Sequence, residues 1–187
     1  VMNLMIGSGR EVGDLMINDR RFPLISATGS CAMGRKVGNA VSKRLGRSLL
    51  ELGGNNAIIV MDDADMEMAM SAILFGAVGT TGQRCTSTRR IFLQKGIADK
   101  FTNKLTNTYK QVRIGNPLDS STLMGPLVDS SARDSYVQAI GTIKKEGGKI
   151  LYGGNIIDGD GFFVEPTIVQ ANIEMDIVKE ETFAPIL

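Results

Sequence analysis

Cys85 is the residue whose neighbours best suit a nucleophile. It lies in the polar, glycine-rich run 79–86, directly after Arg84. A structural cysteine favours apolar neighbours, and a nearby cation favours the reactive thiolate. The residue types alone leave a catalytic thiol and an unreactive loop cysteine equally open. Cys31, the other cysteine, is expected to be inert.

Glu51 is the candidate general base. It lies in an apolar stretch that ends at Gly53-Gly54. Burying a carboxylate in such a stretch costs free energy, and a buried carboxylate suits a group that takes a proton from water. An ordinary glutamate on an edge strand is an equal alternative.

Two glycine patterns could each place the start of a helix against a phosphate. They are Gly7-x-Gly9-x-x-x-Gly13 and Thr28-Gly29-Ser30-x-x-x-Gly34. The free N–H groups and the dipole at a helix start attract anions. One such pattern is a weak signal, but two in succession, each after a strand, favour a nucleotide-binding sheet.

Short apolar strands alternate with amphipathic helices around these residues, which predicts an α/β fold. Strands are expected at 1–6, 23–26, 48–52, 57–61, 91–93, 149–152 and 162–169. Helices are expected at 11–18, after Ser30, from an Asp62 or Asp63 cap to about 78, at 97–112 and at 130–146. A strand, a glycine turn and a helix thus occur twice near the start, as in a doubly wound sheet.

The composition narrows the classes of function. The 187 residues contain no histidine, which excludes Ser-His, Cys-His and histidine-metal chemistry, and no metal site is expected. Two cysteines make no disulfide framework and suit a reducing compartment, the cytoplasm or a mitochondrial matrix. The net charge of +1, without a basic cluster, argues against nucleic acid as a partner. No apolar run is long enough to span a membrane.

Three stretches resemble signatures of the aldehyde dehydrogenase superfamily, in the family's order. They are Glu51-Leu52-Gly53-Gly54-Asn55, Gly82-Gln83-Arg84-Cys85 and Glu181-Thr182-Phe183-Ala184-Pro185. Within the superfamily the chain is most similar to the antiquitin group, through residues 47–59, 152–154, 164–169 and 181–187. The resemblance implies an NAD(P)-dependent aldehyde dehydrogenase. It also implies the end of a Rossmann-like NAD-binding domain at 1–53 and a truncated α/β catalytic domain at 54–187.

The resemblance also implies a role for particular residues. Cys85 would be the nucleophile and Glu51 the base. For the cofactor, NAD with NADP left open, Gly29 and Ser30 would hold the pyrophosphate, Leu52 would approach the nicotinamide, Glu181 would bind its ribose, and Phe183 would pack nearby. The substrate would be a small aldehyde, α-aminoadipic semialdehyde being the best candidate. Arg84 and Thr86 would contact its polar end, although Arg84 could equally serve the thiol or pair within the protein.

The chain departs from the family's pattern at a few positions. Ala27 stands where an aromatic residue is usual, and Met33 where a β-branched one is, and both lie near the expected pyrophosphate site. The family's oxyanion asparagine and adenosine-binding lysine lie upstream of this segment, and its oligomerisation strands lie downstream. Both ends are therefore expected to be internal cuts. The 187 residues alone should be inactive, and the complete enzyme should be a homodimer or homotetramer.

Two other functions are compatible with the sequence. A CoA-acylating dehydrogenase would release the acyl group to a thiol and would not need the Glu51 base. A non-catalytic relative could keep the fold alone, but retention of Cys85, Glu51 and Glu181 together argues against it.

Overall fold

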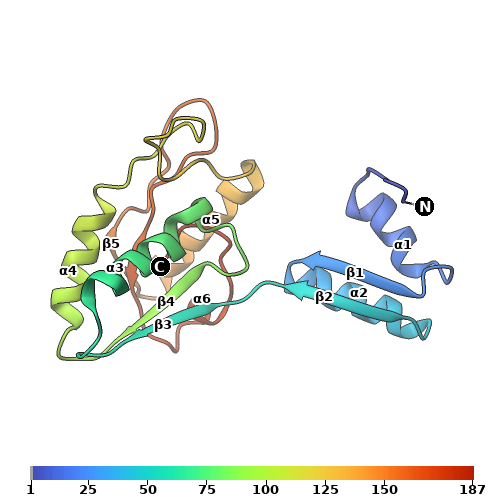
Figure 1. The fold of residues 1–187 in the computed structure, drawn as a ribbon, viewed down its shortest axis with the longest axis horizontal. Coiled ribbons are helices and arrows are strands. Elements are labelled where there is room, and N and C mark those ends of the chain that lie inside the picture. The colour runs from blue at the N-terminus through green and yellow to red at the C-terminus, as the bar shows by residue number, and fades with distance from the viewer. Residues whose placement is uncertain (1) are drawn as a thin grey trace. The chain divides into compact units, whose positions relative to one another are not determined.

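The computed structural model describes residues 2–187 and forms two compact units, Val1–Gly53 and Gly54–Leu187 (Figure 1). In each unit helices pack against small sheets, so the fold is of the α/β class, as predicted. None of the helices in residues 2–187 combines the length and the apolar character needed to cross a membrane.

The first unit is a strand–helix–strand motif preceded by a short helical segment. Its elements are η1 (Gly9–Gly13), α1 (Asp14–Asn18), β1 (Leu24–Gly29), α2 (Cys31–Lys43) and β2 (Arg47–Leu52). The strands β1 and β2 pair in parallel, and α2 is the crossover between them. The apolar faces of α1, α2 and β1 form a small core of Ile17, Ile25, Val37 and Val41.

The predicted strand at 1–6 is wrong for the residues that the structure describes. Residues 2–8 form no regular element, and the side chains of Met2, Leu4 and Ile6 are exposed. A strand needs a neighbour to receive its backbone hydrogen bonds, and β1 pairs only with β2 in the described part of the chain. Apolar residue types were therefore not enough to make this segment a strand.

The helix α2 lies very close to β2 because of one glycine. A Cβ atom built on Gly34 would lie 2.5 Å from the side chain of Leu52, so a larger residue would push the two elements apart. The third glycine of a dinucleotide-binding pattern has this packing role in general. Gly34 therefore acts on helix–strand packing rather than on a phosphate.

The second unit contains two more small sheets. Its elements are β3 (Asn56–Val60), α3 (Met66–Val78), η2 (Gly79–Gly82), β4 (Thr88–Leu93), α4 (Ala98–Tyr109), α5 (Ser130–Lys145), β5 (Lys149–Tyr152), β6 (Ile168–Gln170) and α6 (Asp176–Lys179). The strands β3 and β4 pair in parallel, while β5 and β6 are antiparallel. The predicted strand at 162–169 is shorter than expected, because Pro166 has no N–H to donate to a ladder.

The start of α3 differs from the prediction by two residues. The side chain of Asp65, not of Asp62 or Asp63, accepts hydrogen bonds from the backbone N–H groups of Glu67 and Met68. The two earlier aspartates lie in the turn that closes between Met61 and Ala64. They are thus too far from the first helical N–H groups to cap them.

Two buried tyrosines in the second unit differ in whether their hydroxyl groups are satisfied. Tyr136 hydrogen-bonds the carbonyl of Glu165 and the hydroxyl of Thr167, at 2.9 and 2.8 Å. Burial raises the pKa of Tyr136 to about 12, so its phenol stays protonated at neutral pH. The hydroxyl of Tyr109 is also buried but has no hydrogen-bond partner in the described part of the chain.

Removing these two hydroxyl groups should therefore have different effects on stability. We expect Tyr136→Phe to lower the free energy of unfolding by about 1–2 kcal/mol, because it breaks hydrogen bonds in the core. We expect Tyr109→Phe to leave stability unchanged or raise it by about 1 kcal/mol, because it removes an unsatisfied polar group. Urea unfolding of the two variants checks this, and an equal loss in both would show that Tyr109 has a partner.

Candidate active site

Cys85 lies on an exposed loop between η2 and β4. The chain enters this loop through three successive residues with positive φ, Thr80, Thr81 and Gly82, at 53°, 56° and 66°. A β-branched residue in this region is strained, and such strain persists only where surrounding contacts hold it. The geometry before Cys85 is therefore imposed by tertiary contacts rather than by local preference.

One of those contacts is the close approach of Gly82 to the segment near the chain end. A side chain on Gly82 would overlap the backbone of Ala184 and Pro185. Only glycine fits at this place, both for the space and for its positive φ. The signature around Cys85 and the signature around Phe183 are thus packed against each other within the second unit.

Side chains hold the loop on both sides of the nucleophile. Asn56 donates its amide N–H groups to the carbonyls of Cys85 and Ser87, at 2.7 and 2.9 Å. Before the cysteine, Thr81 donates to the carbonyl of Gly125 at 3.0 Å, and the amide oxygen of Gln83 accepts from the N–H of Val128 at 2.9 Å. In residues 2–187 no hydrogen bond engages the backbone N–H of Cys85, which leaves it available to an oxyanion.

Arg89 is a member of the site that the sequence analysis did not single out. Its side chain is buried, with an exposed fraction of 3%, and it forms an ion pair with Glu181 at 3.1 Å. The guanidinium also donates to four backbone carbonyls, those of Gly54, Gly82, Arg84 and Thr182. Desolvation lowers the pKa of Arg89, while the charges of Glu181 and Cys85 raise it. The buried cation near the thiol is therefore Arg89.

A signal for Arg89 was present in the sequence. The strand β4 begins at Thr88, three residues earlier than predicted. With period-two alternation, Arg89 then lies on the same side of the strand as Ile91 and Leu93. An arginine in register with inward-facing apolar residues is costly to bury unless it is fully paired, and that pattern favours a functional or structural ion pair.

Arg84, the predicted substrate contact, stacks on an aromatic ring. Its guanidinium carbon lies 5.0 Å from the centre of the Phe75 ring. Its Nε is buried and has no hydrogen-bond partner in the described residues. Thr86, on the other side of Cys85, is exposed. The guanidinium thus retains donor capacity that no carboxylate of the second unit satisfies.

The residues predicted to hold the cofactor divide between the two units. Gly29, Ser30, Glu51 and Leu52 belong to the first unit, and Glu181 and Phe183 to the second. In the first unit Ser30 caps the exposed start of α2, where its hydroxyl accepts from the N–H of Met33 at 3.2 Å. In the second, Phe183 is exposed and its ring lies 5.3 Å from the guanidinium carbon of Arg89.

Glu51 is exposed within its unit, so the expected burial among apolar residues is not found there. It lies on β2 between Leu50 and Leu52, which are both half-buried. Successive side chains of a strand point to opposite faces. The leucines therefore face α2, and Glu51 lies on the other face of the sheet.

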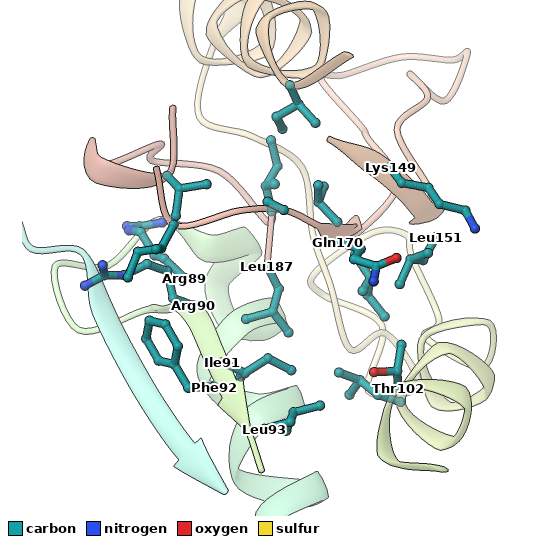
Figure 2. Close-up of a pocket in the computed structure, with 18 of the residues that line it drawn as sticks. Arg89, Arg90, Ile91, Phe92, Leu93, Thr102, Lys149, Leu151, Gln170 and Leu187 are labelled. Carbon is teal, nitrogen blue, oxygen red and sulfur yellow. The ribbon is translucent and has the colours of Figure 1, made fainter. Parts of the chain in front are cut away.

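A cavity of about 740 Å³ lies elsewhere in the second unit. Figure 2 shows its walls, with Arg89–Leu93 of β4 on one side and Lys149, Leu151 and Gln170 of β5 and β6 on another. Neither Cys85 nor Glu181 lines this cavity, so it is separate from the loop that carries the thiol. Residues 2–187 contain no cluster of three or more Cys, Asp or Glu side chains that could hold a metal ion.

Comparison with known proteins covers the whole chain. A model of the aldehyde dehydrogenase family matches residues 1–187. The chain is 50% identical over 179 residues to aldehyde dehydrogenase family 7 member B4 of Arabidopsis thaliana, which covers 96% of this chain and 35% of that protein. It is 49% identical over 180 residues to α-aminoadipic semialdehyde dehydrogenase of Rattus norvegicus, covering 96% and 33%.

A solved structure shows the same arrangement of elements. Betaine aldehyde dehydrogenase from Staphylococcus aureus, determined in complex with NAD⁺, superposes with a TM-score of 0.94 and is 36% identical. The match covers 97% of this chain and 37% of that one. The chain therefore spans about a third of the length of the relatives it matches.

Proposed function

The chain belongs to the aldehyde dehydrogenase family, and from this premise we propose that it is the nucleophile-bearing section of an enzyme that oxidises an aldehyde to a carboxylic acid with NAD⁺. One observation supports this most directly. The thiol of Cys85 is exposed on a loop that Asn56 and Arg89 hold from both sides. The experiment that tests the proposal replaces Cys85 by alanine and measures aldehyde-dependent reduction of NAD⁺.

The first half of the reaction takes place at Cys85. Its thiolate adds to the aldehyde carbonyl and forms a thiohemiacetal, whose oxyanion the free N–H of Cys85 stabilises. Bound NAD⁺ supplies the hydride acceptor. Loss of the hydride from the former aldehyde carbon leaves a thioester on Cys85.

The second half of the reaction needs a base for water. The proposed base is Glu51, whose exposed side chain water can reach. Water attacks the thioester, its proton goes to the carboxylate, and the C–S bond breaks to release the acid and the thiol. A CoA-acylating enzyme would not need this base, so an available Glu51 favours hydrolysis over transfer to a thiol.

The residues present fit a dinucleotide. The start of α2 is exposed and offers N–H groups that suit the pyrophosphate, beside Gly29 and Ser30. In the second unit only one oxygen of Glu181, Oε1, accepts hydrogen bonds from residues that the structure describes. The other oxygen can accept from ribose hydroxyls, and the exposed Phe183 ring can pack near the nicotinamide.

The proposed substrate class is an aldehyde that carries a carboxylate, with α-aminoadipic semialdehyde as the candidate. The rat relative bears the name of that substrate. In this chain Arg84 precedes the nucleophile; its Nε is buried, so a substrate carboxylate would meet the terminal Nη donors of the guanidinium. An arginine offers a planar fork of donors that matches a carboxylate, and Phe75 keeps its plane fixed. Thr86 adds an exposed hydroxyl on the other side of the thiol.

Replacing Arg84 should change which aldehyde is preferred. We expect Arg84→Ala to lose about tenfold or more in kcat/KM for α-aminoadipic semialdehyde relative to an uncharged aldehyde of similar length, because charge-assisted hydrogen bonds contribute about 1.5–3 kcal/mol. Arg84→Lys keeps the charge without the fork and should fall between the two. If both substrates lose rate in the same proportion, Arg84 serves the thiol and not the substrate.

A further inference from the structure

Arg89 contacts both the segment that carries Cys85 and the segment that carries Glu181. An arginine side chain has five N–H donors, and all are used here. Nε donates to Gly54 at 3.3 Å, Nη1 to Gly82 at 3.1 Å and Thr182 at 2.6 Å, and Nη2 to Arg84 at 3.0 Å and the Glu181 carboxylate at 3.1 Å. No other residue type could replace this set of contacts.

The burial of this arginine has to be compensated, and Glu181 compensates it. The Arg89 side chain is 3% exposed and that of Glu181 is 18% exposed. Removing a charge from water is unfavourable unless it is paired and hydrogen-bonded. An apolar residue of the same volume would leave Glu181 and four backbone carbonyls without these donors, which is itself unfavourable. The ion pair therefore points to a requirement on Glu181.

That requirement is the orientation of the carboxylate. Glu181 Oε1 accepts from Arg89 and also from the backbone N–H of Gly54, at 3.3 Å. Two donors on one oxygen fix the carboxylate in direction as well as in position. The second oxygen is left without a donor among the described residues, and the side chain is partly exposed.

We propose that Arg89 is a positioning residue that orients Glu181 toward the ribose of the cofactor and, through the Gly82 and Arg84 carbonyls, ties that carboxylate to the loop of Cys85. This rests on the proposed function, in which Glu181 binds the nicotinamide ribose. Arg89 itself touches neither cofactor nor substrate. Its effect on cofactor binding depends on Glu181. An experiment that removes Glu181 therefore distinguishes this role from a purely structural one.

The test is a double-mutant cycle on cofactor affinity in the enzyme of family length that carries this chain. The Kd for NAD⁺ is measured by fluorescence titration for wild type, Arg89→Lys, Glu181→Gln and the double variant. Lysine keeps the charge but has three donors instead of five. We expect Arg89→Lys to weaken NAD⁺ about tenfold, and the double variant to bind as Glu181→Gln alone does. Additive losses would overturn the proposal.

The neighbouring arginine is a matched control. Arg90 lies next on the same strand, and its guanidinium donates only to the carbonyl of Asn55. It forms no hydrogen bond or ion pair with Glu181 among the described residues. Arg90→Lys should therefore leave the Kd for NAD⁺ within about twofold of wild type, with any change in melting temperature serving to measure the purely structural effect of such a substitution.

A second measurement decides the matter if Arg89→Lys does not fold. ADP-ribose carries the ribose but has no nicotinamide ring that could cover the thiol. A change in the rate of iodoacetamide labelling of Cys85 on its binding therefore reports the link between the Glu181 segment and the Cys85 loop. We expect ADP-ribose to change the labelling rate by about threefold or more in wild type and not in Glu181→Gln. An unchanged rate in wild type would overturn the proposal. If Glu181→Gln binds NAD⁺ normally, the proposed function of Glu181 fails instead.

Discussion

Replacing Cys85 by alanine in the enzyme of family length should remove aldehyde oxidation, with a loss in kcat of about 10⁴-fold or more. The reason is that the thioester in the proposed mechanism forms on this thiol. The exposed loop that holds it offers a thiol at only one position. The measurement is aldehyde-dependent reduction of NAD⁺, with NAD⁺ binding followed in parallel to show that the variant is folded.

Cys31 is the matched control for this experiment. It is also exposed, but it begins α2 in the first unit, and its sulfur lies 3.9 Å from the carbonyl of Gly53. Accessibility alone therefore does not distinguish the two thiols. Cys31→Ala should keep turnover within about twofold of wild type. Near-normal activity of Cys85→Ala would rule out the covalent mechanism altogether.

The replacement Glu51→Gln should separate the two halves of the reaction. Hydride transfer needs only a thiolate and a bound aldehyde, whereas hydrolysis of the thioester needs a base for water. We therefore expect one rapid equivalent of reduced cofactor per active site, followed by a steady state lowered by about 10²–10⁴-fold. Stopped-flow measurement of reduced cofactor gives both quantities in one trace.

The stalled species provides an independent check. Rapid acid quenching of Glu51→Gln during turnover, followed by peptide mass spectrometry, should find the acyl group on the peptide that contains Cys85. If burst and steady state fall by the same factor, Glu51 activates the thiol rather than water. If turnover of the wild type requires added CoA and yields an acyl-CoA, the CoA-acylating reaction replaces the proposed one.

Much of the fold was predictable because its pattern is local. The helices α2, α3, α4 and α5 follow from apolar residues at helical spacing, and the strands β2, β3 and β5 from short apolar runs between breakers. The α/β class and the family follow from the same stretches. The strand predicted at the start failed because pairing is not local: nothing in its own residues says whether a neighbouring strand exists.

The sequence predicted the site residues that belong to family signatures, such as Cys85. It did not predict the residues that hold those side chains in place, such as Arg89. Arg89 was missed because β4 was predicted to begin three residues too late, which hid its register with Ile91 and Leu93. Four of its five partners are backbone carbonyls, which any residue type provides. The positive φ angles of Thr80 and Thr81 were also missed. Threonine rarely adopts positive φ, so its presence in the sequence does not indicate such a backbone. The exposure of Glu51 follows from strand alternation, which the apolar run around it concealed.

The contact between Arg89 and Thr182 joins residues that are 93 positions apart. Proteins are synthesised from the N-terminus, at about 5–20 residues per second, so the loop of Cys85 leaves the ribosome several seconds before its supporting segment. Until the segment 181–184 has docked, Gly82 lacks its close contact with Ala184, and Arg89 lacks its ion pair with Glu181 and its hydrogen bond to Thr182. The nucleophile loop therefore acquires its final geometry only at a late stage of synthesis. A nascent chain shorter than this carries the thiol but not the arrangement that would direct it toward an aldehyde.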